Sequence, residues 1–243
     1  MNPVQALMAR HRSIRRFAPE ELDGGTLRRA VEAAQMAASS SNIQAYSLLH
    51  IRDAGKRERL AELCGAQAMV ATAGAFLVVC GDARRHRLLA ERTGRAFVAN
   101  LETFLLAVVD ASLFAQNLAL ALESEGLGIC FVGGLRTRLP EADRVLAIPD
   151  DVFPLFGLCV GVPAEEPAPR PRLPVEAILF DERYPGDEEL LARIARYDET
   201  MSAYYARRGK RGYDWSGGVS RKFAKPLREH LHDYYRSKGA HLS

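Results

Sequence analysis

Residues 97–125 read FVANLETFLLAVVDASLFAQNLALALESE, and this stretch constrains the architecture more than any other. Apolar or small residues recur along it at spacings of three and four, which predicts one long helix over the whole stretch. Further leucines and valines widen the apolar stripe well beyond one face, so the helix must be covered on most of its sides. It is therefore either a central core helix or a helix shared with a second subunit. We expect Gly126 and Gly128 to end it.

Shorter segments on either side predict an α+β fold. Further helices are expected at about residues 2–11, 26–38, 54–64, 139–148, 187–206 and 221–237. Buried strands are expected at YSLLHI (46–51), AFLVVCG (75–81), GICFVGG (128–134) and VFPLFGLCVG (152–161). The first helix begins at an Asn2-Pro3 cap and should bury Val4, Leu7 and Met8. Without an internal repeat or a clean linker, we expect a single domain over residues 1–243, in which 187–243 form a basic helical extension.

The composition is that of an ordinary globular protein, with 48% hydrophobic and 26% charged residues in a chain of 243. A net charge of only +3 argues against a dedicated nucleic-acid binder. The charge is unevenly placed, because the segment from Ala203 to the end holds ten Lys or Arg against three Asp or Glu, and the rest holds 23 against 27. A basic end on a mildly acidic body predicts an anionic small ligand or a localised anionic partner.

The four cysteines, Cys64, Cys80, Cys130 and Cys159, are widely spaced, and three lie in apolar, strand-like runs. This pattern predicts buried free thiols in a reducing cytosol rather than disulfides or zinc ligands. The first residues lack the long apolar region of a signal sequence, and no uninterrupted apolar run reaches the ~20 residues that a membrane span needs. We therefore expect a cytoplasmic protein without membrane contact.

The common catalytic motifs are mostly absent. The sequence has no Walker A loop, no HExxH and no GxSxG, and the glycines between 126 and 134 do not make GxGxxG. His230 and His232 lie two apart on a predicted helix and cannot share a face, so we expect no metal site there. No nucleophile–base pair stands out. If the protein is an enzyme, a cofactor must carry the chemistry.

The segment RHRSIRRF (10–17) concentrates four arginines, a histidine and a serine around two apolar residues. Short basic runs are usually solvated surface. Arginine also presents a fixed fork of N–H donors that matches phosphate oxygens. Taken alone, the segment is therefore either a solvated basic face or part of a site for a bound anion.

Four more features could hold a polar ligand, and each has a plainer alternative. Arg170 and Arg172 in the Pro-rich stretch could grip one ligand along its length, or lie solvated on a surface strap. The SSSN run at 39–42 offers hydroxyls and amides, or simply ends a helix. Gln67 could be a ligand contact or a surface glutamine, and the VGG run at 132–134 permits close backbone approach or forms a tight turn.

Taken in order, these pieces resemble the nitroreductase superfamily, in particular its branch of NADPH-preferring flavin reductases and oxygen-insensitive nitroreductases. The resemblance covers essentially the whole chain. It rests on HRSIRRF, the SSS run, Gln67, VVDASLFAQNLALALESEGLG, GICFVGGLR, FPLFGLCVG, the RPRLP strap and the YY…RG…W…S tail. Each is weak alone, but together they stand in register over most of the sequence.

The resemblance implies a mostly antiparallel central sheet flanked by helices, with the long central helix at the interface of a homodimer. It also implies one FMN bound at each interface site. His11, Arg12, Ser13 and Arg15 would line the FMN, with Arg12, Ser13 and Arg172 near its phosphate. The remaining implied contacts to the ribityl chain, the ring edge or the phosphate end are Ser39, Ser41, Gln67, Val132, Gly133, Gly134 and Arg170.

The implied activity is a ping-pong reaction in which NADPH reduces the bound FMN and an electron acceptor then receives two electrons. The flavin carries the hydride, so no catalytic side chain is required, which agrees with the missing motifs. Arg208 and Arg211 resemble the residues that hold the 2′-phosphate of NADPH, and Lys222 and Lys225 would border the acceptor pocket. The alternative for this segment is a solvated basic loop.

Two positions depart from the family pattern. Arg170 stands where the family usually has lysine, which keeps the charge but replaces a compact ammonium with a planar fork. Asn42 stands where several relatives carry an aromatic residue over the active site. We expect Asn42 to change which acceptors are preferred, and an Asn42→Phe variant to restore a typical profile.

The sequence leaves the physiological acceptor open. Reduction of nitroaromatics or quinones is the main interpretation, and an NADPH:flavin reductase that supplies free reduced flavin is the alternative within the enzyme class. A non-catalytic module that binds nucleic acid or another ligand is a remote third. It lacks support because the sequence has no helix-turn-helix and no basic motif interleaved with aromatic residues.

Overall fold

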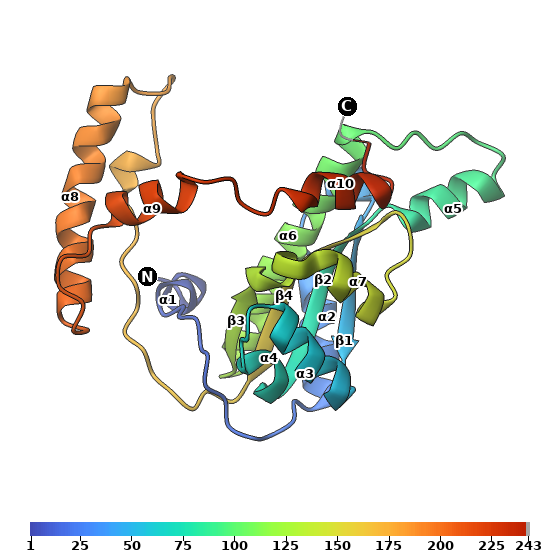
Figure 1. Ribbon diagram of the computed structural model, residues 1–243, viewed down its shortest axis with the longest axis horizontal. Coiled ribbons are helices and arrows are strands. Elements are labelled where there is room, and N and C mark those ends of the chain that lie inside the picture. The colour runs from blue at the N-terminus through green and yellow to red at the C-terminus, as the bar shows by residue number, and fades with distance from the viewer. Residues whose placement is uncertain (242–243) are drawn as a thin grey trace. The chain divides into compact units, whose positions relative to one another are not determined.

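The computed structural model describes residues 1–241, whose contacts gather into two compact units. One unit comprises Met1–Pro167 together with the chain from Arg228 onward, and the other comprises Ala168–Leu227. The single-domain partition made from the sequence stays a prediction. The two units are described separately below (Figure 1).

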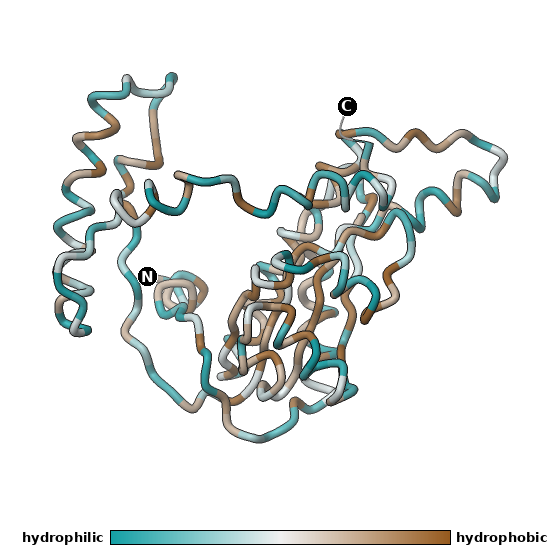
Figure 2. The backbone as a smooth tube through the Cα atoms, in the orientation of Figure 1, coloured by the Kyte–Doolittle hydropathy of each residue, from teal (hydrophilic) through white to brown (hydrophobic). Residues whose placement is uncertain are grey.

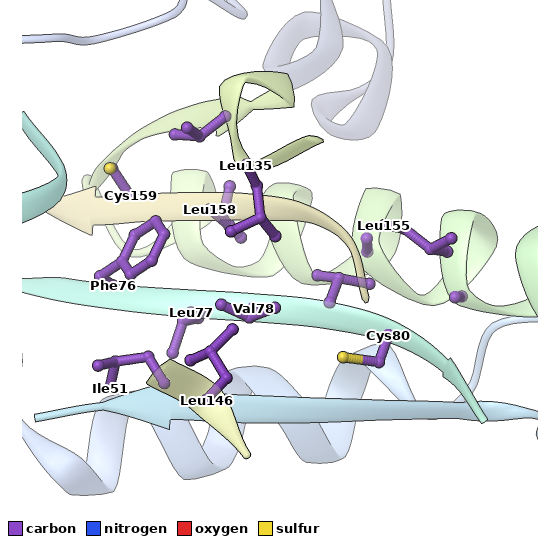
Figure 3. Packing of buried hydrophobic residues seen from close by; sticks show 14 of the residues in the cluster. Ile51, Phe76, Leu77, Val78, Cys80, Leu135, Leu146, Leu155, Leu158 and Cys159 are labelled. Atoms are coloured by element: carbon purple, nitrogen blue, oxygen red, sulfur yellow. The ribbon is translucent and has the colours of Figure 1, made fainter. Parts of the chain in front are cut away.

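A four-stranded antiparallel sheet forms the centre of the larger unit. Its strands are β1 (Tyr46–Ile51), β2 (Ala75–Asp82), β3 (Gly128–Val132) and β4 (Val152–Gly161), in the spatial order β1-β2-β4-β3. Every residue of β2 is buried, and Figure 3 shows Phe76, Leu77 and Val78 of this strand inside the core. The α+β class and the antiparallel sheet expected from the sequence are therefore confirmed, and the four strands lie in the four predicted segments.

Helix α6 (Leu101–Ser124) packs one of its faces against the sheet and against α2 (Gly24–Ala34). Its buried side chains are mostly small, and Phe114 stacks on Tyr46 of β1 with ring centroids 4.4 Å apart. The helix begins later than expected, because the side chain of Asn100 accepts a hydrogen bond from the amide of Thr103 and caps it there. By length and composition α6 could cross a membrane, but its packing on the sheet makes it a core helix of this unit.

Gly126 ends α6, as expected, whereas Gly128 does not. Gly126 has a φ of +81°, in the left-handed region, and the amide of Leu127 bonds back to the carbonyl of Leu122. This is the Schellman arrangement that commonly ends helices. Gly128 is instead the first residue of β3, where an added Cβ would collide with the side chain of Ile14.

The opposite face of α6 is apolar and stays exposed among residues 1–241. Leu101 and Leu105 are each 45% exposed, Val109 is 51% exposed and Leu113 is 44% exposed, and these four residues follow one another at intervals of four. Helix α1 (Pro3–Ala9) contacts α6, and its Val4 and Met8 are exposed as well. The expectation that Val4 and Met8 are buried is therefore wrong for the single chain.

Asp110 is the exception in the buried face of α6, with only 1% of its surface exposed. Its carboxylate accepts hydrogen bonds from the backbone amides of Ser40 (3.1 Å) and Ala45 (3.0 Å). The loop between these amides contains a 3₁₀ turn at Ser40–Asn42 and three residues with positive φ: Ser41, Asn42 and Gln44. Non-glycine residues seldom adopt this conformation, so the buried carboxylate fixes an unusual loop.

The other helices of this unit lie around the sheet, with α3 (Ala54–Leu63), α4 (Met69–Thr72) and α7 (Leu139–Leu146) in front of it and α2 behind it in Figure 1. Asp53 caps α3 by accepting a hydrogen bond from the amide of Lys56 at 2.7 Å. Helix α5 (Arg84–Arg92) is not among the helices expected from the sequence. This helix is strongly polar and has no buried residue, so it lacks a hydrophobic stripe (Figure 2).

The chain returns to the larger unit through α10 (His230–Ser237). Tyr235 donates its hydroxyl to the carbonyl of Pro154 (2.8 Å), and the buried Lys238 ammonium bonds to the carbonyl of Ile148 and pairs with Asp143 (3.3 Å). The expectation of a single helix over 221–237 is wrong. The chain forms two helices there, α9 (Trp215–Phe223) and α10, because Pro226 cannot continue an α-helix.

The smaller unit consists of the Pro-rich strap, a 3₁₀ turn at Val175–Ala177, α8 (Asp187–Ala206) and α9. Helix α8 spans the predicted residues. Tyr197 on α8 is buried and contacts both the strap and α9. Its hydroxyl donates to the carbonyl of Pro171 in the strap, and its ring packs edge-on against Trp215 of α9. Asp198 accepts from the amide of Ser216 at 2.8 Å, which joins α8 to α9.

We expect Asp110→Ala to lower the free energy of unfolding by about 2–4 kcal/mol, because the amides of Ser40 and the buried Ala45 both lose their carboxylate acceptor. Urea unfolding at constant protein concentration measures the change. Asp181→Ala, at an exposed position, is the control and should change the stability by less than about 0.5 kcal/mol. An Asp110→Ala variant as stable as this control would contradict the assignment of Asp110 as the support of the loop.

Candidate functional site

The segment RHRSIRRF lies along the free edge of β3. Ser13 forms a parallel bridge with Ile129, and the amide of Ile14 donates to the carbonyl of Ile129 at 2.9 Å. Ile14 is buried, and Phe17 bridges to Pro163 beyond the end of β4. The apolar residues of the segment therefore anchor it to the core, which holds its polar neighbours at the sheet edge.

A cavity of about 690 Å³ opens beside this segment, where α6 ends and β3 begins. Its lining includes Arg10, His11 and Arg12 from the segment, together with the carboxylates of Glu123, Glu165 and Glu166. This volume lies within the range of about 300–1,000 Å³ that is usual for ligand sites. The structure thus brings His11 and Arg12 together in one concave site and adds three acidic residues that the sequence did not indicate, while the expected contacts to FMN stay predictions.

The three carboxylates each bond to the basic segment. His11 Nδ1 lies 2.7 Å from Glu123 Oε1, and Arg12 Nη1 lies 3.0 Å from Glu166 Oε1. Because the pairs join residues 112 and 154 positions apart, no local sequence pattern could have indicated them. The only signal was the Glu165-Glu166 pair inside the Pro-rich stretch.

Glu165 is the most heavily bonded of the three. It accepts from the backbone amides of Arg15 (2.6 Å) and Arg16 (3.1 Å) and from Arg16 Nε (3.1 Å). The Arg15 amide, followed by the Arg16 groups, lowers the pKa of this carboxyl below its usual range. Glu165 is therefore ionised at neutral pH and fixes the backbone at Arg15. The Arg15 side chain itself reaches only the carbonyl of Ser13, at 3.5 Å.

Gln67 meets the glycine turn after β3. Its Nε2 donates to the carbonyl of Cys64 at 2.7 Å, and a Cβ on Gly134 would collide with both the Gln67 amide and the Cys64 carbonyl. Only glycine permits this approach. The structure thus joins two sequence-predicted pieces, Gln67 and the Val132–Gly134 turn, while their expected contacts to a flavin stay predictions.

Ser39, Ser41 and Asn42 lie in the loop that Asp110 supports. The amide of Asn42 donates to the carbonyl of Ser39, and Asn42 Oδ1 accepts from Gln44 Nε2 at 3.2 Å. Asp110 was not among the site residues expected from the sequence. A lone carboxylate in the middle of an apolar helix was the signal that could have identified it.

The smaller unit contains a second cavity, of about 340 Å³, which combines cations with aromatic rings. Arg170, Arg172 and Lys222 line it together with Tyr197, Tyr205, Tyr213 and Trp215. Arg208, at the end of α8, donates to the hydroxyl of Tyr204 at 3.1 Å. Arg211 and Lys225 are exposed and lie outside this cavity's lining.

The cysteines offer no nucleophile. All four are buried and free, as expected, and burial raises the pKa of the Cys64 thiol to about 12. Among residues 1–241, no group of three or more His, Cys, Asp or Glu side chains could hold a metal ion. His230 instead contacts the carbonyl of Arg136, and His232 pairs with its neighbour Asp233. The arrangement can bind an anionic ligand but offers no reacting group of its own.

Two family models match the chain: the nitroreductase family over residues 8–162 and the nitroreductase family C-terminal domain over residues 170–243. An FMN reductase (NADPH) of Bacillus subtilis is 39% identical over 98% of each chain. An oxygen-insensitive NADPH nitroreductase of Salmonella typhimurium is 38% identical over 98% of each chain.

Solved structures agree with these matches. The NfrA1 nitroreductase of B. subtilis superimposes with a TM-score of 0.94 at 39% identity, covering 97% of this chain and 98% of that one. The NADPH:FMN oxidoreductase of Vibrio harveyi, solved in complex with NAD⁺, gives a TM-score of 0.89 at 36% identity over 98% of each chain. The chain belongs to the nitroreductase family.

Proposed function

We propose that this protein is an FMN-dependent NADPH oxidoreductase that passes two electrons to nitroaromatics, quinones or related acceptors. The observation that carries the proposal is the cavity beside β3, where Arg10, His11 and Arg12 lie among three carboxylates, in a chain that offers no cysteine nucleophile or metal cluster among its described residues. Such a site needs a bound redox group to do chemistry. Relatives matching nearly the whole chain are named as FMN reductases and NADPH nitroreductases.

The residues present fit FMN. Its phosphate requires cationic and hydroxyl donors, which we assign to His11, Arg12, Ser13 and Arg15 of one segment. His11 and Arg12 line the cavity, whereas Ser13 and Arg15 lie outside its lining. The ion pair between Arg12 and Glu166 does not prevent this, because Glu166 is largely exposed and a surface pair of this kind contributes little. When bound, FMN supplies the two-electron chemistry.

The chain's own residues would bind the flavin and orient it. Arg170 and Arg172 supply two further cations for the phosphate end, held on a strap that proline keeps extended. Ser39, Ser41 and Gln67 offer neutral hydrogen bonds to the ribityl chain or ring edge. The backbone of Gly133 and Gly134 would approach the ring. An added Cβ on Gly133 would meet only Arg136 Nη2 at 3.5 Å, whereas Gln67 and Cys64 already fill the space beside Gly134.

The basic residues of the smaller unit favour NADPH over NADH. We assign Arg208 and Arg211 to the 2′-phosphate, because a guanidinium forms charge-assisted bonds with phosphate that NADH cannot make. Lys222 and Lys225 would border the acceptor pocket, and Asn42 would influence which acceptors enter it.

A second copy of the chain would cover the exposed stripe Leu101, Leu105, Val109 and Leu113 of α6. An apolar stripe of this length is unusual on the surface of a monomer. A homodimer that buries it agrees with the family resemblance and places the FMN site at the subunit interface. The four reduced thiols agree with a cytoplasmic location.

Flavin reduction is the second candidate function. The B. subtilis relative is named an FMN reductase and the V. harveyi relative an NADPH-flavin oxidoreductase, so free flavin itself could be the acceptor. Steady-state rates with FMN, a quinone and a nitrofuran as alternative acceptors distinguish the two functions.

The proposed function makes a prediction about the cofactor and its reductant. The purified protein, reconstituted with FMN if necessary, should show a flavin absorption spectrum that anaerobic NADPH bleaches faster than NADH does. A protein that stays colourless after FMN is added would contradict the proposal, and equal bleaching rates would contradict the assignment of the basic loop.

The proposed function also makes a prediction about the 2′-phosphate, the group that NADPH has and NADH lacks. Arg208→Ala should raise the KM for NADPH by about tenfold or more, because one charge-assisted bond is lost, and should leave the KM for NADH within about twofold. Arg207→Ala, at the neighbouring exposed position, is the matched control. Equal effects of Arg208→Ala on both nucleotides would show that Arg208 does not read the 2′-phosphate.

A further inference from the structure

The strap that carries Arg170 and Arg172 has few means of fixing its own backbone. Proline occupies positions 169, 171 and 174, so three amides that could donate hydrogen bonds are missing. Such a segment cannot join a regular hydrogen-bond ladder. Its position must come from donors that reach its carbonyl oxygens.

Tyr197 of α8 is such a donor. Its hydroxyl lies 2.9 Å from the carbonyl oxygen of Pro171, the residue between the two arginines. The side chain is buried, with 6% of its surface exposed, and the edge-on contact with Trp215 at 5.4 Å fixes the plane of its ring. The hydroxyl therefore comes from a rigid position.

The arginines depend on the same stretch of backbone. Arg172 Nη1 donates to the carbonyl of Arg170 at 2.9 Å, so the side chain of one folds against the backbone of the other. Both side chains line the 340 Å³ cavity that Tyr197 also lines. A rotation of the Pro171 peptide would move both guanidinium groups at once.

Tyr204 lies further along the same helix, α8, and provides a natural comparison. Its hydroxyl lies 3.5 Å from the carbonyl of Ala168, outside the arginine pair, and its side chain is less buried. At that distance the bond is weak. The chain thus contains two tyrosines that reach the same strap, only one of which holds the peptide between the arginines.

We infer that Tyr197 is a positioning residue, whose hydroxyl holds the Pro171 peptide so that Arg170 and Arg172 present their guanidinium groups to the phosphate of the flavin cofactor. This inference rests on the proposed function. It assigns Tyr197 no contact with the flavin and no part in electron transfer.

The test compares two flavins that differ only by the phosphate. Apoprotein is titrated with FMN and with riboflavin, and flavin fluorescence gives a Kd for each. Tyr197→Phe keeps the ring and removes the hydroxyl, so we expect the FMN Kd to rise about five- to tenfold. The riboflavin Kd should change less than about twofold, since riboflavin makes no phosphate contact. Tyr204→Phe should change neither Kd, and thermal unfolding checks that both variants fold.

Each result decides the inference. The preference for FMN over riboflavin is the ratio of the two Kd values. The inference is supported if this preference falls in Tyr197→Phe toward the value of an Arg172→Ala variant. An unchanged preference overturns it, as does an equal rise in both Kd values, which would make the hydroxyl a support of the unit as a whole. A wild-type protein that binds neither flavin would overturn the proposed function as well, whereas a wild type that prefers FMN with Tyr197→Phe unaltered overturns this inference alone.

Discussion

The packing of α6 against the sheet is the interaction on which the rest of the larger unit depends. The small residues of its buried face let the helix lie close to the strands, and Phe114 stacks on Tyr46 at the centre of that contact. From this position Asp110 holds the loop at 39–45. The helix end at Gly126 then directs the chain into β3, whose edge receives RHRSIRRF. One helix thus positions two of the segments that are candidates for flavin binding.

Charge in this protein is arranged in two ways. In the larger unit, carboxylates that come from distant parts of the chain hold the basic segment, as Glu123 does for His11 and Glu165 does for the backbone at Arg15. In the smaller unit, tyrosines and a tryptophan line a cavity together with the cations, and none of the lining residues is acidic. The cations of the strap therefore keep their full attraction for a phosphate, which suits them to an anionic ligand.

The strands were predicted as short apolar runs and the core of α6 from its periodic pattern, α8 was predicted over its observed residues, and the family resemblance implied that His11 and Arg12 line one site. Helix α5, which has no hydrophobic stripe, was not predicted, and α9 was joined to α10 across Pro226. The ion pairs of Glu123 and Glu166 could not be predicted, since they depend on which distant segments the topology brings together. Asp110 was visible only as a charge in an apolar helix, and the exposure of Val4 and Met8 required the packing of α1 to be known.

The central claim is that a second copy covers the exposed face of α6 and completes the flavin site. Analytical ultracentrifugation with absorption optics tests it directly, because it reports mass and bound flavin together. We predict that the wild type sediments as a dimer that carries flavin, that Val109→Glu sediments as a monomer without it, and that Thr72→Glu, on α4 in front of the sheet (Figure 1), resembles the wild type. A wild-type monomer that sediments with its full flavin content would contradict the account.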